Sequence, residues 1–413
     1  MRSQWITSWI IWLRHHKKKF SLIIASFSAL TVALAIFLEA KTANFLFEGE
    51  ASLVLLSMLL MSLLAIKLLD SLKTAVLLLF VMLSLYFISS SLFLILGIAE
   101  NEFSVLARVV IVTLMMSHLI HFLTALLREM ARGLHQYDAI IEALAITHQP
   151  ILLSSLTTML GFAVVSFVNT QFSIMAYQVI IGVVLSYASL LVLVPIILLQ
   201  WLLEFRVGHY SDRHGLDNIV KTFVKYPPLA LFSQIVFLLV VAFMFINIWF
   251  TIEPITALLS MLFVSFILLL LAWQKISVAL ITILVALFSV LFAISLLTTI
   301  NFIPSITALV LLVPIGIVLD DAVHFFTRYI RAEKAYISDK SGKVKYSLNS
   351  VGRPIWLTSQ LLIVGLFVLL FSENLLVVHA SAVTILALIF VSFILLWVLP
   401  SFNKRKEQPS KNV

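Results

Sequence analysis

The chain has 413 residues, of which 62% are hydrophobic and 11% are charged, and its mean hydropathy is +1.15. Soluble globular chains are about half apolar and about a quarter charged, so this composition excludes an ordinary soluble enzyme, a disordered chain and a fibrous repeat. Lys and Arg outnumber Asp and Glu by 27 to 19, and the absence of cysteine excludes disulfides and thiolate metal sites. The sequence predicts an all-α, multi-pass membrane protein.

Twelve apolar stretches are long enough to cross the hydrocarbon core of a bilayer, for which a helix needs about 20 residues. The first is followed by no small-residue cleavage signal, so we expect it to be retained as a helix. In chain order the predicted spans are Phe20–Leu38, Ala51–Leu69, Ala75–Ile98, Phe103–Leu127, Pro150–Val168, Ile174–Leu199, Pro228–Trp249, Ile255–Ala272, Ile276–Thr298, Ile303–Thr327, Pro354–Phe371 and Val378–Leu399.

The basic residues predict the orientation of these spans. If the N-terminus is cytoplasmic, 25 of the 27 Lys and Arg residues fall in cytoplasmic segments, and only Lys41 and Arg108 do not. Because cytoplasmic loops carry an excess of Lys and Arg, we expect both termini to lie in the cytoplasm.

The chain also repeats itself. His121–Thr124 recurs as His324–Thr327 at an offset of 203 residues, and Pro150–Ser155 recurs as Pro354–Ser359 at an offset of 204. Since six spans return the chain to the same side, the copies are predicted to be parallel. Residues 1–205 form the first six-helix repeat, with an amphipathic cytoplasmic helix near 129–147. Residues 206–403 form the second repeat, and 404–413 a disordered cytoplasmic tail.

Asp320 and Asp321 are the two acids in the middle of a predicted span. One aspartate at a helix centre costs about 2.5–3.5 kcal/mol on insertion scales, and such residues are functional by default. Removing water from a carboxylate favours its neutral form, which suits a proton carrier. The alternative is a buried polar network that only holds helices together.

The matching positions of the fourth span are Ser117 and His118. If the copies pack around a central axis, His118 and Asp321 take equivalent places, and a His–Asp pair can pass a proton. His121 and His324 lie one turn further along their spans. They either belong to the same network or face the headgroups at the ends of their helices.

Histidine and aspartate also bind metals. His118, His121, Asp321 and His324 would supply four ligands if their helices touched, but no tight sequence motif supports such a site. We therefore predict no metal and no cofactor.

Hydroxyl side chains open the eleventh span. Thr358 and Ser359 are either contacts between helices or hydrogen-bond partners of a buried carboxylate. The sequence contains no Walker A loop, dinucleotide fingerprint or nucleophile elbow, so we expect neither ATP-driven transport nor an enzyme.

Three segments carry a family resemblance. Leu127–Leu144 followed by Pro150–Phe162 resembles the fourth-to-fifth-span region of the resistance–nodulation–division (RND) superfamily, and of its MMPL-type exporters in particular. Gly316–His324 with Thr327–Tyr329 resembles the central motif of the second half, and Lys225–Pro228 the way these halves begin. The resemblance implies a multi-pass protein of the bacterial inner membrane that exports lipids, amphiphiles or drugs against protons.

The resemblance also implies a proton relay, because the family places carboxylates at the positions of Asp320 and Asp321. The first-half positions depart from the family pattern with Ser117 and His118, so the relay is asymmetric, with His118 as its third member. Ser117, His121, His324, Thr358 and Ser359 are the expected supporting residues.

A second departure concerns the outside of the membrane. Family members usually carry a large domain after the first span of each half, whereas Glu39–Glu50 has twelve residues here and Phe250–Pro254 has five. Our leading hypothesis is a compact, proton-coupled transporter of a hydrophobic or amphiphilic, lipid-like substrate. Its expected partners are membrane lipids and a separate periplasmic or membrane protein, with no nucleic acid. The alternative is a non-transporting bundle that senses lipid or sterol, or a scaffold for a partner protein.

Overall fold

The computed structural model describes residues 4–22, 50–98, 101, 103–168, 172–204, 219, 222–223, 225–248, 255–303 and 308–402. Within these ranges the regular structure is helical, as expected where backbone groups in lipid must bond within their own segment. The long helices are α2 (Glu50–Leu69), α3 (Leu72–Ile95), α4 (Ser104–Ala131), α5 (Gln136–Val168), α6 (Ser173–Leu191), α9 (Pro227–Ile248), α10 (Ile255–Trp273), α11 (Ile276–Thr299), α12 (Ala308–Lys334), α14 (Arg353–Val368) and α15 (Leu375–Phe393). The short ones are α7 (Leu193–Leu198), α13 (Lys340–Ser347) and α16 (Leu399–Ser401), with π-helical turns η4 (Leu348–Gly352) and η6 (Ile394–Val398) and the 3₁₀ turn η5 (Leu369–Phe371).

Nine helices in the described part of the chain are long and apolar enough to cross a membrane. Two shorter apolar helices, Pro227–Phe243 and Leu258–Trp273, coincide with the predicted seventh and eighth spans. Eleven of the twelve predicted spans therefore coincide with apolar helices. Most of the predicted first span, Phe20–Leu38, lies outside the described residues, as does the predicted tail 404–413.

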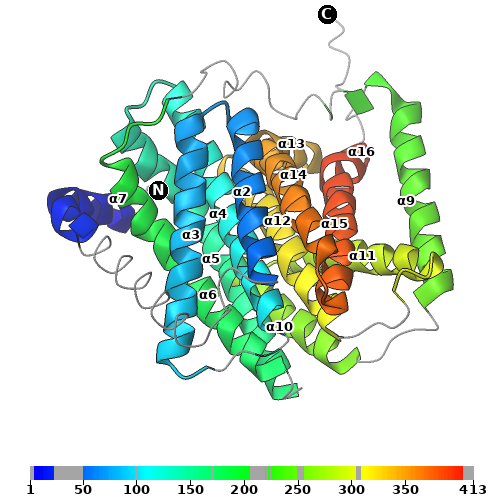
Figure 1. The fold of residues 1–413 in the computed structure, drawn as a ribbon. Helices are drawn as coiled ribbons and strands as arrows, with labels where there is room; N and C mark the ends of the chain where they lie inside the picture. The colour runs from blue at the N-terminus through cyan, green and yellow to red at the C-terminus, as the bar shows by residue number, and fades with distance from the viewer. Residues whose placement is uncertain are drawn as a thin grey trace, which may run out of the picture.

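Helices α4 and α12 run through the middle of the bundle (Figure 1). Every residue of the most apolar 18-residue stretch of each is buried, whereas in the other seven spanning helices the buried share is 39 to 67%. The central place follows from composition, because α4 and α12 carry His and Asp side chains that would be costly against lipid.

The contacts between helices recur when the two halves are exchanged. Helix α2 of the first half packs against α14 of the second, and correspondingly α10 of the second half packs against α5 of the first. A Cβ atom at Gly161 would lie 2.7 Å from Met261 Cγ, and one at Gly365 would lie 2.6 Å from Met61 Sδ. Each glycine thus lets a helix of the other half approach closely.

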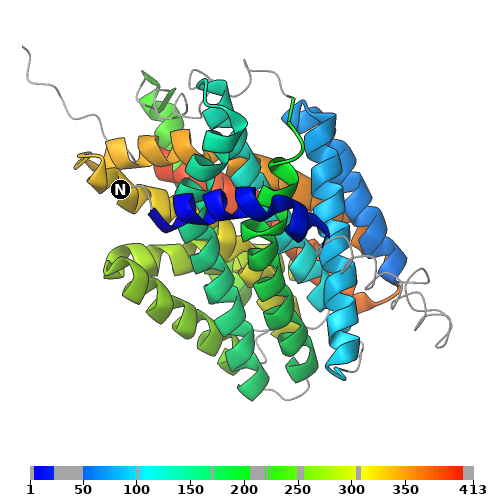
Figure 2. The same cartoon turned by 90° about the vertical axis from the view of Figure 1, so that its left-hand side faces the viewer.

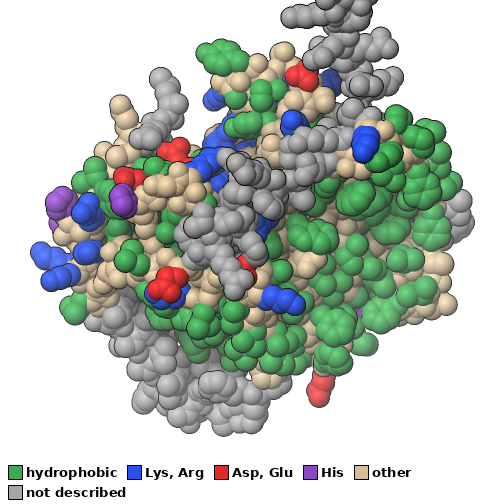
Figure 3. Space-filling view, turned by 90° about the horizontal axis from the view of Figure 1, so that it is seen from above, with side chains coloured by type: hydrophobic (Ala, Val, Ile, Leu, Met, Phe, Trp, Pro, Cys, Tyr) green, Lys and Arg blue, Asp and Glu red, His purple; other side chains and the backbone are tan. Residues whose placement is uncertain are grey.

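Two arginine clamps also recur. Arg128, at the end of α4, donates to the carbonyls of Asn349 and Ser350 at 3.0 Å each. Arg331, at the end of α12 and 203 residues later, donates to the carbonyl of Ile146 at 2.9 Å. Each clamp joins an arginine of one half to backbone of the other. Lys and Arg side chains gather at this end of the bundle (Figure 3).

The helix expected near 129–147 has different bounds. Residues 129–131 end α4, Gly133 turns the chain with φ of +98°, and α5 then runs without a break from Gln136 through Pro150 to Val168. Pro150 is tolerated inside the helix, as proline often is in membrane helices, so the break falls at the glycine instead. In the second half the matching helix also continues without a break, from Lys340 through α13, η4 and α14 to Phe371, with the π-helical turn η4 just before Pro354.

An additional helix over residues 4–22 was not predicted from the sequence. It lies across the neighbouring helices rather than along them (Figure 2). Ile6, Ile10 and Leu13 are buried beneath it, and Trp9 Nε1 donates to the Leu191 carbonyl at 3.0 Å. The apolar residues recur every three or four positions, which is the pattern of an amphipathic helix.

Candidate functional site

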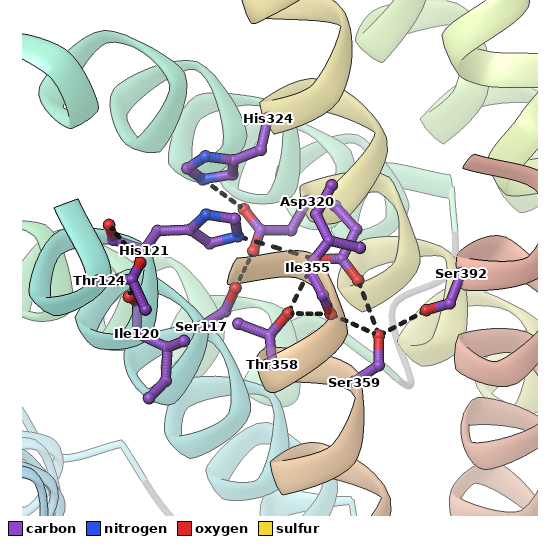
Figure 4. A network of polar contacts seen from close by, with 11 residues as sticks. Ser117, Ile120, His121, Thr124, Asp320, His324, Ile355, Thr358, Ser359 and Ser392 are labelled. Atoms are coloured by element: carbon purple, nitrogen blue, oxygen red, sulfur yellow. Dashed lines mark hydrogen bonds and ion pairs between the residues drawn. The ribbon is translucent and has the colours of Figure 1, made fainter. Parts of the chain in front are cut away.

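The predicted acids and histidines meet where α4 and α12 face each other at the centre of the bundle (Figure 4). Asp320, Asp321, His121 and His324 are each at most 2% exposed. Two carboxylates and two imidazoles are therefore held together out of contact with solvent.

Asp320 is held from both helices. Ser117 on α4 donates a hydrogen bond to its Oδ2 atom, and His324, one turn along α12, has Nε2 3.5 Å from Oδ1. Ser117 and Asp320 are the matching positions of the two repeats. The two halves thus face each other at equivalent residues, although at Ser117 and Asp320 and not at the predicted His118 and Asp321.

Asp321 points toward α14 and α15. Thr358 Oγ1 lies 3.2 Å from its Oδ1 atom, Ser359 Oγ lies 3.5 Å from Oδ2, and Ser359 is paired with Ser392 at 2.6 Å. Thr358 and Ser359 are therefore hydrogen-bond partners of a carboxylate, one of the two alternatives left open above. Ser392 was missed, because a single serine in an apolar helix carries no distinguishing pattern.

His121 and His324 stack on each other, with ring centroids 3.6 Å apart and planes 9° from parallel. His121 Nε2 also lies 3.8 Å from Asp321 Oδ1, so one histidine contacts each aspartate. Both rings are buried, so of the two alternatives left open they belong to the network and do not face the headgroups. The spacing of one helical turn after Ser117 and Asp320 was the signal that places them here.

His118 does not meet Asp321. Its Nδ1 atom lies 3.2 Å from Ser186 Oγ on α6, and Ser186 in turn contacts Met115. Successive residues of a helix point about 100° apart, so if Ser117 faces α12, its neighbour must face elsewhere. The predicted His118–Asp321 pair is corrected to a His121–Asp321 pair.

The side chains that lie close enough to hold a metal are not the four that the sequence suggested. His121, Asp320 and His324 each offer a ligand atom, and these atoms lie within 4.8 Å of one another. An imidazole binds a metal in the plane of its ring, whereas these two planes are stacked nearly parallel. One ring would have to rotate before both could bind the same ion, so the geometry fits contact with the carboxylates better than shared metal ligation.

Two solved structures resemble the chain over most of its length. Crystal structures of SecDF, one in a super-membrane-facing form and one from Thermus thermophilus that is described as translocon-associated, match with TM-scores of 0.65 and 0.66. The sequence identities are 13% and 14%, and the matches cover 86% and 85% of this chain. They cover 62% and 61% of the SecDF chains, so this chain spans less than two thirds of that protein.

SecDF is a membrane protein of the RND superfamily. The chain is therefore an all-α, multi-pass membrane protein with an RND-like transmembrane fold, as the resemblance in its sequence implied. No protein-family model and no curated protein matches it.

Proposed function

We propose that the chain is a proton-coupled, RND-like exporter of a hydrophobic or amphiphilic substrate. One observation carries the proposal: Asp320 and Asp321 are buried at the crossing of α4 and α12, and each is contacted by a hydroxyl and by a histidine of its own. A carboxylate in that setting can take up a proton and release it when its surroundings open to water. Histidine is the side chain best suited to pass that proton on.

The finer parts of the hypothesis belong to the same proposal. We propose twelve spans in two parallel six-helix repeats, which the exchanged glycine contacts and arginine clamps support. The basic end of the bundle would face the cytoplasm of a bacterial inner membrane. MMPL-type exporters remain the branch whose substrates fit best. Membrane lipids and a separate periplasmic or membrane protein are the proposed partners, with no enzymatic reaction and no cofactor.

The proposal is tested by proton flux in proteoliposomes of bacterial polar lipids that hold the purified chain. Asp320→Asn and Asp321→Asn keep the side-chain shape and remove the titration, so each should lower flux at least tenfold while the protein stays folded by circular dichroism and gel filtration. Asp138→Asn, at an exposed position of α5, is the matched control and should not change flux.

The second candidate is a lipid-sensing bundle or scaffold without transport. It is favoured by the asymmetry of the site, since Ser117 and His118 stand where the second half has two acids. Normal behaviour of Asp320→Asn, Asp321→Asn and the double variant in the flux assay would refute proton coupling and favour this second candidate.

A further inference from the structure

A cavity of about 270 Å³ opens between α14, α15 and η6. Its volume lies just below the range of about 300–1,000 Å³ that is usual for small-molecule pockets. The lining side chains are Trp356, Ser359, Gln360, Ile363, Ile389, Ser392, Phe393, Leu396 and Trp397. We refer to this cavity as the α14–α15 pocket.

The mouth of the α14–α15 pocket is apolar and open to the surroundings of the bundle. Trp356, Ile389 and Trp397 are 48%, 51% and 43% exposed. All three lie in helices that are long and apolar enough to span the membrane, so their exposed sides face lipid. A molecule dissolved in the bilayer can therefore reach the pocket from the side.

The floor of the pocket is polar. Ser359 and Ser392 are buried there and hydrogen-bonded to each other at 2.6 Å, and Gln360 adds an amide group that can both donate and accept. Ser359 is also the residue whose hydroxyl lies 3.5 Å from Asp321 (Figure 4). The pocket thus leads from lipid to the hydroxyls that contact the buried carboxylate.

The lining carries no charged side chain. An ionised headgroup would lose its hydration here without gaining a counter-ion, and an anion would also approach Asp321. A hydroxyl, amide or ester avoids both costs and matches the donors and acceptors of Ser359, Ser392 and Gln360. The apolar remainder of the ligand would fill the space beside Ile363, Phe393 and Leu396.

We infer that the α14–α15 pocket binds an uncharged amphiphile, with one apolar chain and one small polar group, that enters sideways from the bilayer. Its polar group contacts Ser359 and Ser392, the same hydroxyls that lie against Asp321. Binding itself requires no transport. Only the consequence that an occupied pocket changes proton transfer at Asp321 rests on the proposed function.

The test uses the full-length chain in lipid nanodiscs and a monoacylglycerol that carries a diazirine on its acyl chain. After photolysis, mass spectrometry maps the labelled residues. We expect saturable labelling within residues 356–397. Unlabelled monoacylglycerol should compete at least tenfold more effectively than a fatty acid or a long-chain alkylamine of the same length.

Two variants and one control locate the site. Ile389→Trp fills the exposed mouth and Ser392→Leu removes a floor hydroxyl, and each should lower labelling of α14 and α15 at least tenfold. Val184→Trp makes a comparable enlargement on α6, where Val184 is 52% exposed, and should change labelling less than twofold. Ile389→Trp alters a lipid-facing residue, so it tests the site without disturbing the buried core.

Labelling spread evenly over the lipid-facing helices would overturn the inference. So would labelling unchanged by Ile389→Trp, or equal competition by the fatty acid. Because labelling is measured without a pH gradient, normal labelling of a chain that conducts no protons would refute the proposed function and leave the site in place. If proton flux depends on Asp321 but labelling is not localised, the binding site is refuted and the proposed function stands.

Discussion

The direction in which a side chain of α4 points determines which residues it contacts. Ser117 and His121 are four residues apart and both face α12, where they contact Asp320 and Asp321. His118 lies between them in sequence but faces α6 and contacts Ser186. The face of α4 on which a residue lies therefore predicts its contact with the aspartates better than its alignment with Asp320 or Asp321 in the repeat does.

This difference gives a prediction for two histidines of the same helix. His121→Ala removes the imidazole that contacts Asp321 and stacks on His324, so it should lower proton flux at least tenfold. His118→Ala removes a contact with a serine and should lower flux less than threefold. The initial rate of proton flux in proteoliposomes measures both, and the opposite ranking would restore His118 as the partner of the carboxylates.

At the scale of helices, the ends of α4 and α12 are joined across the two halves. Arg128 satisfies the carbonyls of Asn349 and Ser350, which belong to the π-helical turn η4. Hydrogen bonds that involve a charged group contribute about 1.5–3 kcal/mol. The bond to Ser350 is partly buried and the bond to Asn349 is exposed, and both help to hold the two halves together.

Arg128→Met should accordingly destabilise the chain by about 1.5–3 kcal/mol. The measurement is the midpoint of thermal unfolding in detergent, followed by circular dichroism. Arg132→Met is the control, because Arg132 lies one turn further on the same helix and pairs with Glu129 at a half-exposed position. Such surface pairs contribute about 0–1 kcal/mol. Equal losses for the two variants would show that the clamp is not what stabilises this end.

The apolar runs made most helices predictable. The internal repeat indicated that equivalent positions of the two halves would meet, but the predicted pair was His118 with Asp321 and the observed pair is Ser117 with Asp320. The break at Gly133 instead of Pro150 was not, because tolerance of proline in a membrane helix depends on its neighbours. The helix over residues 4–22 carried a readable signal in the spacing of Ile6, Ile10 and Leu13. The basic residues that follow it were interpreted only as a marker of orientation, so the amphipathic pattern was not recognised.

For the whole molecule, the distribution of charge predicts how it sits in the membrane. Lys73 lies in the first turn of α3, and Arg128 and Arg331 lie near the ends of α4 and α12. Lys343 lies within α13 and Arg353 begins α14. Lys and Arg side chains gather on the side of the bundle seen in Figure 3. The bundle should therefore insert with this side in the cytoplasm, because positively charged segments are retained there.

Reporter fusions test this orientation. An alkaline phosphatase reporter should be inactive when fused within residues 205–218 and active when fused within residues 39–50, since it folds only outside the cytoplasm. A cytoplasmic fluorescent reporter at the same two places should give the reverse pattern. Matching signals from both places would mean that the number of spans between them is even, and the twelve-span arrangement would be wrong.

The exchanged contacts between the halves have an evolutionary consequence. Gly161 accommodates Met261 and Gly365 accommodates Met61, so each copy supplies the notch that the other copy fills. A duplicated unit of this kind cannot drift freely, because a larger residue in one copy must be matched by a smaller one in its twin. The packing residues are therefore expected to vary together across the two copies, whereas the central positions already differ, with Ser117 in one half facing Asp320 in the other.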